Sequence, residues 1–267
     1  MPVLNHPSAP SYNYHFNKIS DSVLMDGKIR DSCKNFNYIF ILFTNRSGSN
    51  LLASCISSSN NFNTPAEFLN HDEVEKALEI DPSLRTVGDY FSAIALNDNV
   101  DGTFCAKLSC DHLFVLCASG VMAQIVNKST FVLIERSDKI DQAMSLILAV
   151  KRNIWSACKE RPETIAETHN VEVQDIIDVC YSIVDQNNIL ESFMIDSMAS
   201  SLKVLYEDLV VNPISCLDRI SEKIGKPIPY VARNVAMKKQ ADIGKKVNKT
   251  KLISEVRNSL LTRKQQT

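Results

Sequence analysis

The chain has 267 residues, of which 45% are hydrophobic and 22% charged, enough for one large α/β domain or two small ones. Its formal net charge of −2 gives no support for a nucleic-acid-binding surface. The eight cysteines form no C-x-x-C pair, which favours reduced core thiols over a zinc site. The sequence shows no membrane-spanning stretch and no apolar signal segment, so we expect a cytoplasmic protein.

Residues 1–36 are polar, contain three prolines and show no clear periodicity. We expect an N-terminal extension of low order here, with a short helix near Ser20–Arg30, and we assign it no chemistry. The folded domain is then expected to cover residues 37–267.

The most informative stretch begins at Tyr38 with YIFILF, a run of β-formers typical of a buried parallel strand. Small polar residues follow over 44–50, and helical spacing of apolar residues begins at Leu51. A strand, a small-residue loop and a helix in this order direct free backbone N–H groups towards one point, where a phosphate or sulfate can bind. Gly48 lies in this turn, where backbone freedom is needed. The same turn also occurs in α/β proteins that bind no anion.

Downstream, predicted strands alternate with predicted helices. The strands are expected over residues 103–108, 130–135 and 201–206, and the helices over 72–80, 86–96, 111–126, from 138 onward, 171–194 and from 213 to a stop at Gly225. Ser137 or Asp138 should cap the helix that starts near 138, and Asn212 should cap the helix that starts at Pro213.

This alternation predicts a single α/β domain with a central parallel sheet flanked by helices. Ligands of such sheets bind at the carboxyl ends of the strands. Arg46, Lys107 and Arg136 all fall at or just beyond predicted strand ends. Three cations at one edge suggest a polyanionic ligand. The loop lacks the lysine and second glycine of a Walker-type G-x-x-x-x-G-K-[ST], and no G-x-G-x-x-G is present, which disfavours an ATPase or a dehydrogenase.

The loop Arg46-Ser47-Gly48-Ser49-Asn50-Leu51-Leu52 resembles the R-S-G-S-T-L-L loop of bacterial carbohydrate sulfotransferases of the trehalose 2-sulfotransferase type. Further segments resemble motifs of this family in the same order: PAEF at 65–68, AKL at 106–108, RSD and QAMS at 136–138 and 142–145, YEDL at 206–209, and KQAD at 239–242. The resemblance covers roughly residues 38–242. The chain departs from the family pattern at Asn50, Ser137 and Lys239.

The resemblance implies a P-loop-like sulfotransferase architecture and the donor 3′-phosphoadenylyl sulfate (PAPS), which leaves as 3′,5′-adenosine bisphosphate (PAP). The N–H groups of residues 47–50, with the Arg46 side chain and the Ser49 hydroxyl, would hold the 5′-phosphosulfate. Leu51, which follows them in the same motif, is also included among the donor-binding residues. Arg136 and Ser145 match the family's positions for the 3′-phosphate. Lys239 and Gln240 match a late family motif and are included among the donor-binding residues.

The resemblance also implies the catalytic roles. Glu67 matches the family's base, which takes a proton from the acceptor hydroxyl, and His71 is the second candidate. Arg46 would stabilise the leaving phosphate, and Lys107 would contact the sulfate or organise the site. The scheme requires no metal ion.

Three functions remain open at this point. The first is an enzyme that transfers a sulfuryl group from PAPS to a hydroxyl of a carbohydrate, glycolipid or other small acceptor. The second is a protein of the same fold that binds a nucleotide or sulfated ligand without turnover, and the third is a nucleotide-dependent phosphotransferase. We expect no nucleic-acid partner. Members of the family can form homodimers, although this sequence carries no signal of oligomerisation.

Overall fold

The computed structural model describes residues 14–152, 171–231, 253–256 and 258. These residues divide between two compact units. The first unit comprises residues 12–137 and 186–231, and it contains the whole sheet. The second unit includes the described residues 138–152 and 171–185.

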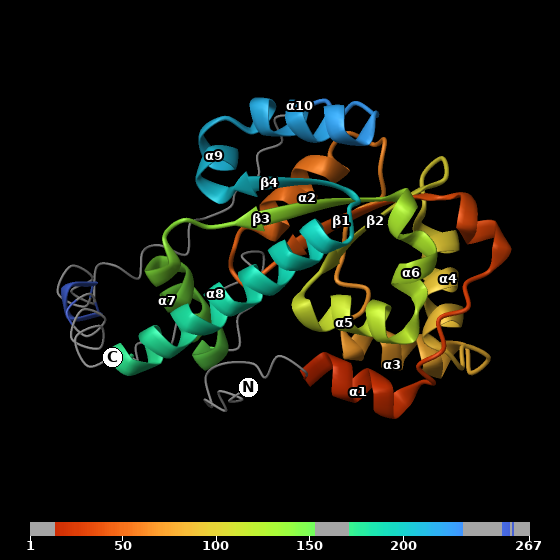
Figure 1. The fold of residues 1–267 in the computed structure, drawn as a ribbon, viewed down its shortest axis with the longest axis horizontal. Helices are drawn as coiled ribbons and strands as arrows, with labels where there is room; N and C mark the ends of the chain where they lie inside the picture. Colours follow the sequence, from red (N-terminus) through yellow and green to blue (C-terminus); the bar gives the residue numbers. More distant parts are fainter. Residues whose placement is uncertain (1–13, 153–170, 232–252, 257, 259–267) are drawn as a thin grey trace. The chain divides into compact units, whose positions relative to one another are not determined.

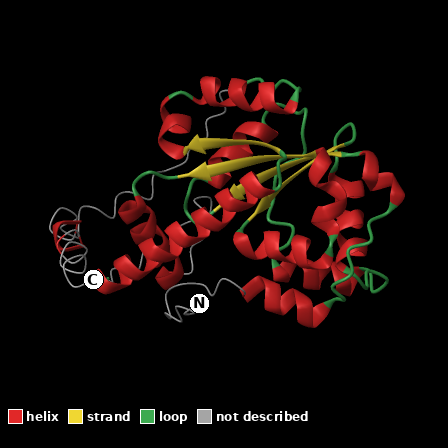
Figure 2. Cartoon of the chain, in the orientation of Figure 1, coloured by secondary structure: helices red, strands yellow, loops and turns green. Residues whose placement is uncertain are grey.

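The sheet of the first unit has four parallel strands in the order β2-β1-β3-β4 (Figure 2, yellow). They are β1 Asn37–Phe43, β2 Thr103–Leu108, β3 Ser129–Glu135 and β4 Ser200–Leu205. Six of the seven residues of β1 are buried, because this strand has a neighbour on each side and helices on both faces. The predicted fold class, an α/β protein with a central parallel sheet flanked by helices, is confirmed.

Alternate residues of β1 enter two separate apolar clusters, as the period of a strand requires. Tyr38, Phe40 and Leu42 pack with the cluster that includes helices α1, α3, α4, α5 and α6. Ile39, Ile41 and Phe43 pack with the cluster that includes α2, α9 and α10 on the opposite face (Figure 1). The helices have these bounds: α1 Tyr14–Ser22, α2 Ser49–Ser57, α3 His71–Ile80, α4 Val87–Asp98, α5 Cys110–Ser119, α6 Val121–Ile125, α9 Tyr206–Val211 and α10 Pro213–Ile224.

The structure differs from the sequence-based expectation between residues 111 and 126. We expected one helix, but Gly120 adopts a left-handed conformation with φ 83° and ends α5. The chain then continues as α6 and a short 3₁₀ helix, η2 Val126–Lys128. Glycine occupies this conformation at little cost, so a helical apolar pattern can continue across a break in the backbone.

Residues 14–36 also differ from the expectation of low order. They contain α1 and a 3₁₀ helix, η1 Asp31–Asn35, and they bury Ile19, Ile29 and Cys33 in the core. Leu24 forms an isolated parallel bridge with Thr86. The helix lies earlier than the expected Ser20–Arg30. The start of the domain at residue 37 remains a prediction.

The second unit contains α7 Lys139–Arg152 and the first half of α8 Val173–Asp196. Asp138, one of two predicted caps, accepts a hydrogen bond from the Asp141 backbone N–H at 2.8 Å. In the first unit, Asn212 caps α10 through the Ser215 N–H and Gly225 ends it, as predicted.

No single helix among the described residues has the length and hydropathy needed to cross a membrane. The segments Cys110–Ser119 and Val121–Lys128 have this length and hydropathy only when they are taken together, and the chain bends by 82° between them.

Candidate functional site

The strand order places a topological switch point between β1 and β3. The chain leaves β1 towards β2 on one side, and it leaves β3 towards β4 on the other side. Because these neighbouring strands send their connections in opposite directions, their carboxyl ends mark the place where α/β proteins of this topology bind ligands. The loop after β1 carries Arg46, and Arg136 directly follows β3. The two predicted anion-binding segments therefore flank the switch point.

The loop after β1 turns sharply into α2. The Ser47 N–H donates to the Thr44 carbonyl at 3.1 Å, and both Arg46 (φ 65°) and Gly48 (φ 100°) adopt left-handed conformations. No side chain of the described residues caps α2. The first helical acceptor is the Gly48 carbonyl, which receives the Leu51 and Leu52 N–H groups. The N–H groups at the helix start therefore have no intrahelical acceptor and, with the helix dipole, favour an anion.

The Ser47 hydroxyl is a second feature of this loop that suits an anion. Ser47 is fully buried, and its Oγ has no hydrogen-bond partner among the described residues. A buried hydroxyl without a partner is costly, by roughly 1–3 kcal/mol. An oxygen of a bound phosphate or sulfate could accept this hydrogen bond, so the loop is suited to an anion of this kind.

Two arginines lie close together at the switch point. Burial, followed by the charge of Arg136, lowers the pKa of Arg46. The Arg136 guanidinium lies over the ring of Tyr206, 5.1 Å from its centre. Neighbouring like charges destabilise each other, and an anionic ligand between them would offset this repulsion.

Lys107 connects the loop after β1 to the predicted base. Its Nζ lies 2.5 Å from Asn50 Oδ1 at the start of α2 and 2.7 Å from Glu67 Oε1. The Lys107 side chain is only 7% exposed, whereas Glu67 is 32% exposed and can be reached by an acceptor. A buried cation requires a partner, so this ion pair holds the Glu67 carboxylate at the edge of the site.

The segment that carries Glu67 lies along the free edge of β2. The Asn63 side-chain amide donates to the Cys105 carbonyl at 2.8 Å and accepts from the Cys105 N–H at 2.7 Å. The Ala66 carbonyl then accepts from the Lys107 N–H at 2.8 Å. These hydrogen bonds bring Glu67 to the same level of the sheet as Lys107.

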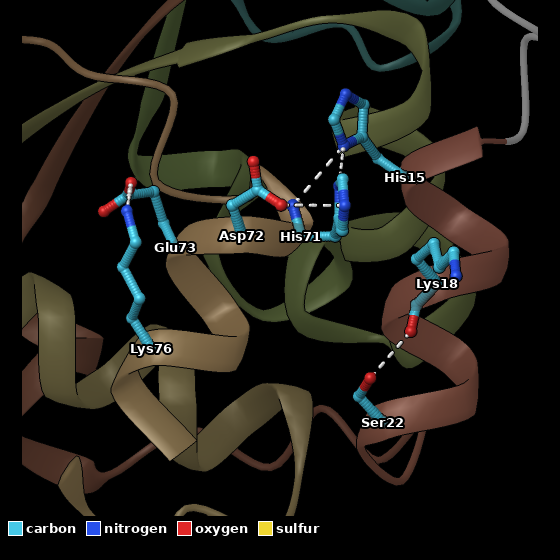
Figure 3. A network of polar contacts seen from close by, with 7 residues as sticks. All are labelled: His15, Lys18, Ser22, His71, Asp72, Glu73 and Lys76. Carbon is cyan, nitrogen blue, oxygen red and sulfur yellow. Dashed lines mark hydrogen bonds and ion pairs between the residues drawn. The ribbon is translucent and has the colours of Figure 1, made fainter. Parts of the chain in front are cut away.

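A polar cluster that the sequence did not reveal includes His15, His71 and Asp72 (Figure 3), and it lies close enough to Glu67 for that charge to act on His15. His15 of α1 and His71 of α3 face each other with their Nδ1 atoms 3.0 Å apart, and His71 Nε2 lies 2.9 Å from Asp72 Oδ1. Burial, and then His71, lowers the pKa of His15, while Glu67 and Asp72 act in the opposite direction. His15 lies in the segment to which we assigned no chemistry. Nothing in the sequence predicts its contact with His71, 56 residues away.

Two buried groups of α5 complete the cluster. The carboxylate of Asp111 accepts the His15 backbone N–H at 3.2 Å, and burial raises the pKa of Asp111 to about 7. Burial, with smaller contributions from His15 and Lys107, lowers the pKa of His112 to about 3. The ring centres of His112 and His15 are 5.3 Å apart. Within the described residues, no group of three or more His, Cys, Asp or Glu side chains is arranged to hold a metal ion.

Some predicted site residues are not brought together here. Ser145 lies on α7 in the second unit, and its pairing with Arg136 remains a prediction. Lys239 and Gln240 lie outside the described residues. The side chain of Leu51 packs against the apolar cluster beneath α2.

A parallel sheet whose switch point carries a small-residue loop that turns directly into a helix is typical of a P-loop-like α/β protein. The model of the Stf0 sulphotransferase family matches residues 105–248, just over half of the chain, and the chain belongs to this family. It is therefore a sulfotransferase. The matched range contains Lys107, Arg136 and Tyr206, whereas the loop after β1 and Glu67 precede it. A search of curated proteins found no match.

Proposed function

We propose that the protein transfers a sulfuryl group from PAPS to a hydroxyl of a carbohydrate, glycolipid or other small acceptor. The observation that carries this proposal is the position of Lys107, whose ammonium bridges Asn50 at the start of α2 and the partly exposed Glu67. A donor loop and a base held by one buried cation are suited to bringing a sulfuryl donor and a hydroxyl together.

In the proposed reaction a bond forms between the acceptor oxygen and sulfur, while the bond from sulfur to the phosphate oxygen of PAPS breaks. Glu67 takes the proton of the acceptor hydroxyl, and PAP leaves. Arg46 and the free N–H groups of α2 stabilise negative charge on the departing phosphate. Lys107 orients the Glu67 carboxylate, and its charge can also offset charge on the sulfuryl oxygens. As in phosphoryl transfer, positioning and charge stabilisation do most of the work.

The donor is tested by thermal shift of the full chain with PAP, 5′-AMP and ATP–Mg²⁺. A ligand that binds only the native state raises its stability by RT ln(1 + [L]/Kd). We expect the largest shift with PAP. A larger shift with ATP–Mg²⁺ would instead support the phosphotransferase.

The base is tested by sulfation assays with labelled PAPS and a panel of hydroxylated carbohydrates and lipids. We expect Glu67→Gln to lower kcat about 10²–10⁴-fold while PAP still binds. Glu73→Gln is the matched control, because Glu73 forms an exposed ion pair with Lys76 at the same 2.7 Å distance. Unchanged turnover in Glu67→Gln together with a loss in His71→Asn would move the role of base to His71. PAP binding without transfer to any acceptor would favour the non-catalytic alternative.

A further inference from the structure

Tyr206 is a residue to which the proposed reaction assigns no role. It is the first residue of α9 and directly follows β4. The register of the sheet pairs Glu135 of β3 with Leu205 of β4. Arg136 and Tyr206, the residues that directly follow these two strands, therefore leave the sheet side by side. The Arg136 guanidinium lies 5.1 Å from the centre of the Tyr206 ring.

The same ring also contacts the loop after β1. A Cβ atom added at Gly48 would lie 2.3 Å from Tyr206 Cδ2 and 3.1 Å from Cε2, so the ring packs directly on the glycine backbone. Gly48 is thus required by this close approach as well as by its φ of 100°. The ring therefore touches the turn where α2 begins and also supports the arginine at the end of β3.

The residue after Tyr206 strengthens this connection. Both carboxylate oxygens of Glu207 accept the Ser137 backbone N–H, at 3.1 and 3.2 Å. The start of α9 therefore contacts the chain after β3 in two places. Tyr206 contacts the Arg136 side chain, and Glu207 contacts the Ser137 backbone. A guanidinium stacked on an aromatic face loses much of its rotational freedom, which prepares it for one ligand geometry.

We propose that Tyr206 is a positioning residue that fixes Arg136 relative to the loop after β1, so that the 3′-phosphate and the 5′-phosphosulfate of the donor are recognised as one unit. This inference rests on the proposed function. Tyr206 itself touches no reacting atom. Its ring sets the relative position of two anion-binding elements on neighbouring strands.

The test compares PAP with 5′-AMP, which lacks the 3′-phosphate. Isothermal titration calorimetry measures the Kd of each for wild type, Tyr206→Leu and Tyr206→Phe. We expect Tyr206→Phe to keep the wild-type ratio of the two affinities, because the ring remains. We expect Tyr206→Leu to lower this ratio about tenfold, in the range of a partly desolvated cation–π contact. In turnover assays, Tyr206→Leu should raise the KM for PAPS more than it lowers kcat.

If Tyr206 were merely structural, its replacement would weaken the binding of PAP and of 5′-AMP equally. An unchanged ratio of the two affinities in a folded Tyr206→Leu variant would therefore overturn the inference. Arg136→Lys gives a second test that leaves Tyr206 intact. It keeps the charge but loses the planar group that stacks on the ring, so the ratio should fall here too, and an unchanged ratio would refute the stacking role. Wild-type protein that binds both nucleotides equally would overturn the 3′-phosphate role of Arg136 itself. The failure of the proposed function is therefore distinct from failure of the inference alone.

Discussion

Asp111 and His112 are adjacent buried residues whose ionisation should change stability with pH in opposite directions. Asp111 is 6% exposed and His112 is 1% exposed. Burial raises the pKa of Asp111 from 3.8 to about 7 and lowers the pKa of His112 from 6.5 to about 3. Asp111→Asn keeps an oxygen for the His15 N–H, and His112→Gln keeps a side chain that can complete the capping box with Ser109. Each variant removes one ionisable group and preserves the hydrogen bond that this side chain accepts.

Whether stability rises or falls with pH depends on which state, native or unfolded, holds the proton more tightly. Native Asp111 holds its proton more tightly than the unfolded chain, so its contribution to stability is present below about pH 4 and is lost as pH rises towards 7. The difference of about 3 pH units, at ~1.4 kcal/mol each, corresponds to ~4 kcal/mol. Native His112 holds its proton less tightly, so its contribution is present above about pH 6.5 and is lost as pH falls towards 3.

Urea denaturation from about pH 4 to about pH 8 measures both effects as differences from wild type, in which the contributions of other groups cancel. The free energy of unfolding of Asp111→Asn, taken relative to that of wild type, should rise as pH rises. This difference should become constant above about pH 7. His112→Gln should gain on wild type as pH falls below about 6.5. Asp21→Asn, an exposed substitution on α1, controls for the loss of one negative charge. A difference between Asp111→Asn and wild type that is constant across this range would refute the reasoning.

Two further predictions concern the site. Gly48→Ala should lower both stability, by about 2 kcal/mol or more, and PAP affinity, because its Cβ would meet the Tyr206 ring at 2.3 Å. Gly120→Ala, where φ is also positive but no atom lies within 4 Å, should cost only the backbone strain of about 1 kcal/mol, and equal losses in urea denaturation would contradict the steric argument. Lys107→Met should lower kcat with labelled PAPS tenfold or more, because Glu67 loses the cation that orients it, whereas unchanged kcat would show that the ion pair is only structural.

The sheet and the loop after β1 could be predicted because their signals are local. YIFILF is apolar or aromatic at every position, and the small polar residues that follow it favour a tight turn. The predicted strand bounds agree with the structure to within one residue. The break at Gly120 was missed because the apolar pattern continues through it.

The connections within the site could not be predicted, because they depend on which segments meet after folding. The sequence suggested both Glu67 and Lys107, but their ion pair requires residues 63–67 to lie along β2 in one register. The contact of His15 with His71 and the position of Tyr206 over Gly48 likewise join residues far apart in the chain. Such contacts leave no periodic signal in the sequence.

The segment from Asn63 to Glu67 is fastened to the rigid edge of β2 by one side-chain amide and one backbone bridge. The sheet therefore fixes the chain just before Glu67, and the hydroxyl of Tyr90 in α4 holds the Phe68 carbonyl just after it. Substitutions on α3, or on α4 at positions other than Tyr90, can reshape the space around an acceptor while the ion pair with Lys107 still holds the carboxylate. In this architecture the choice of acceptor can evolve separately from proton removal, so relatives with different acceptors could retain the same ion pair.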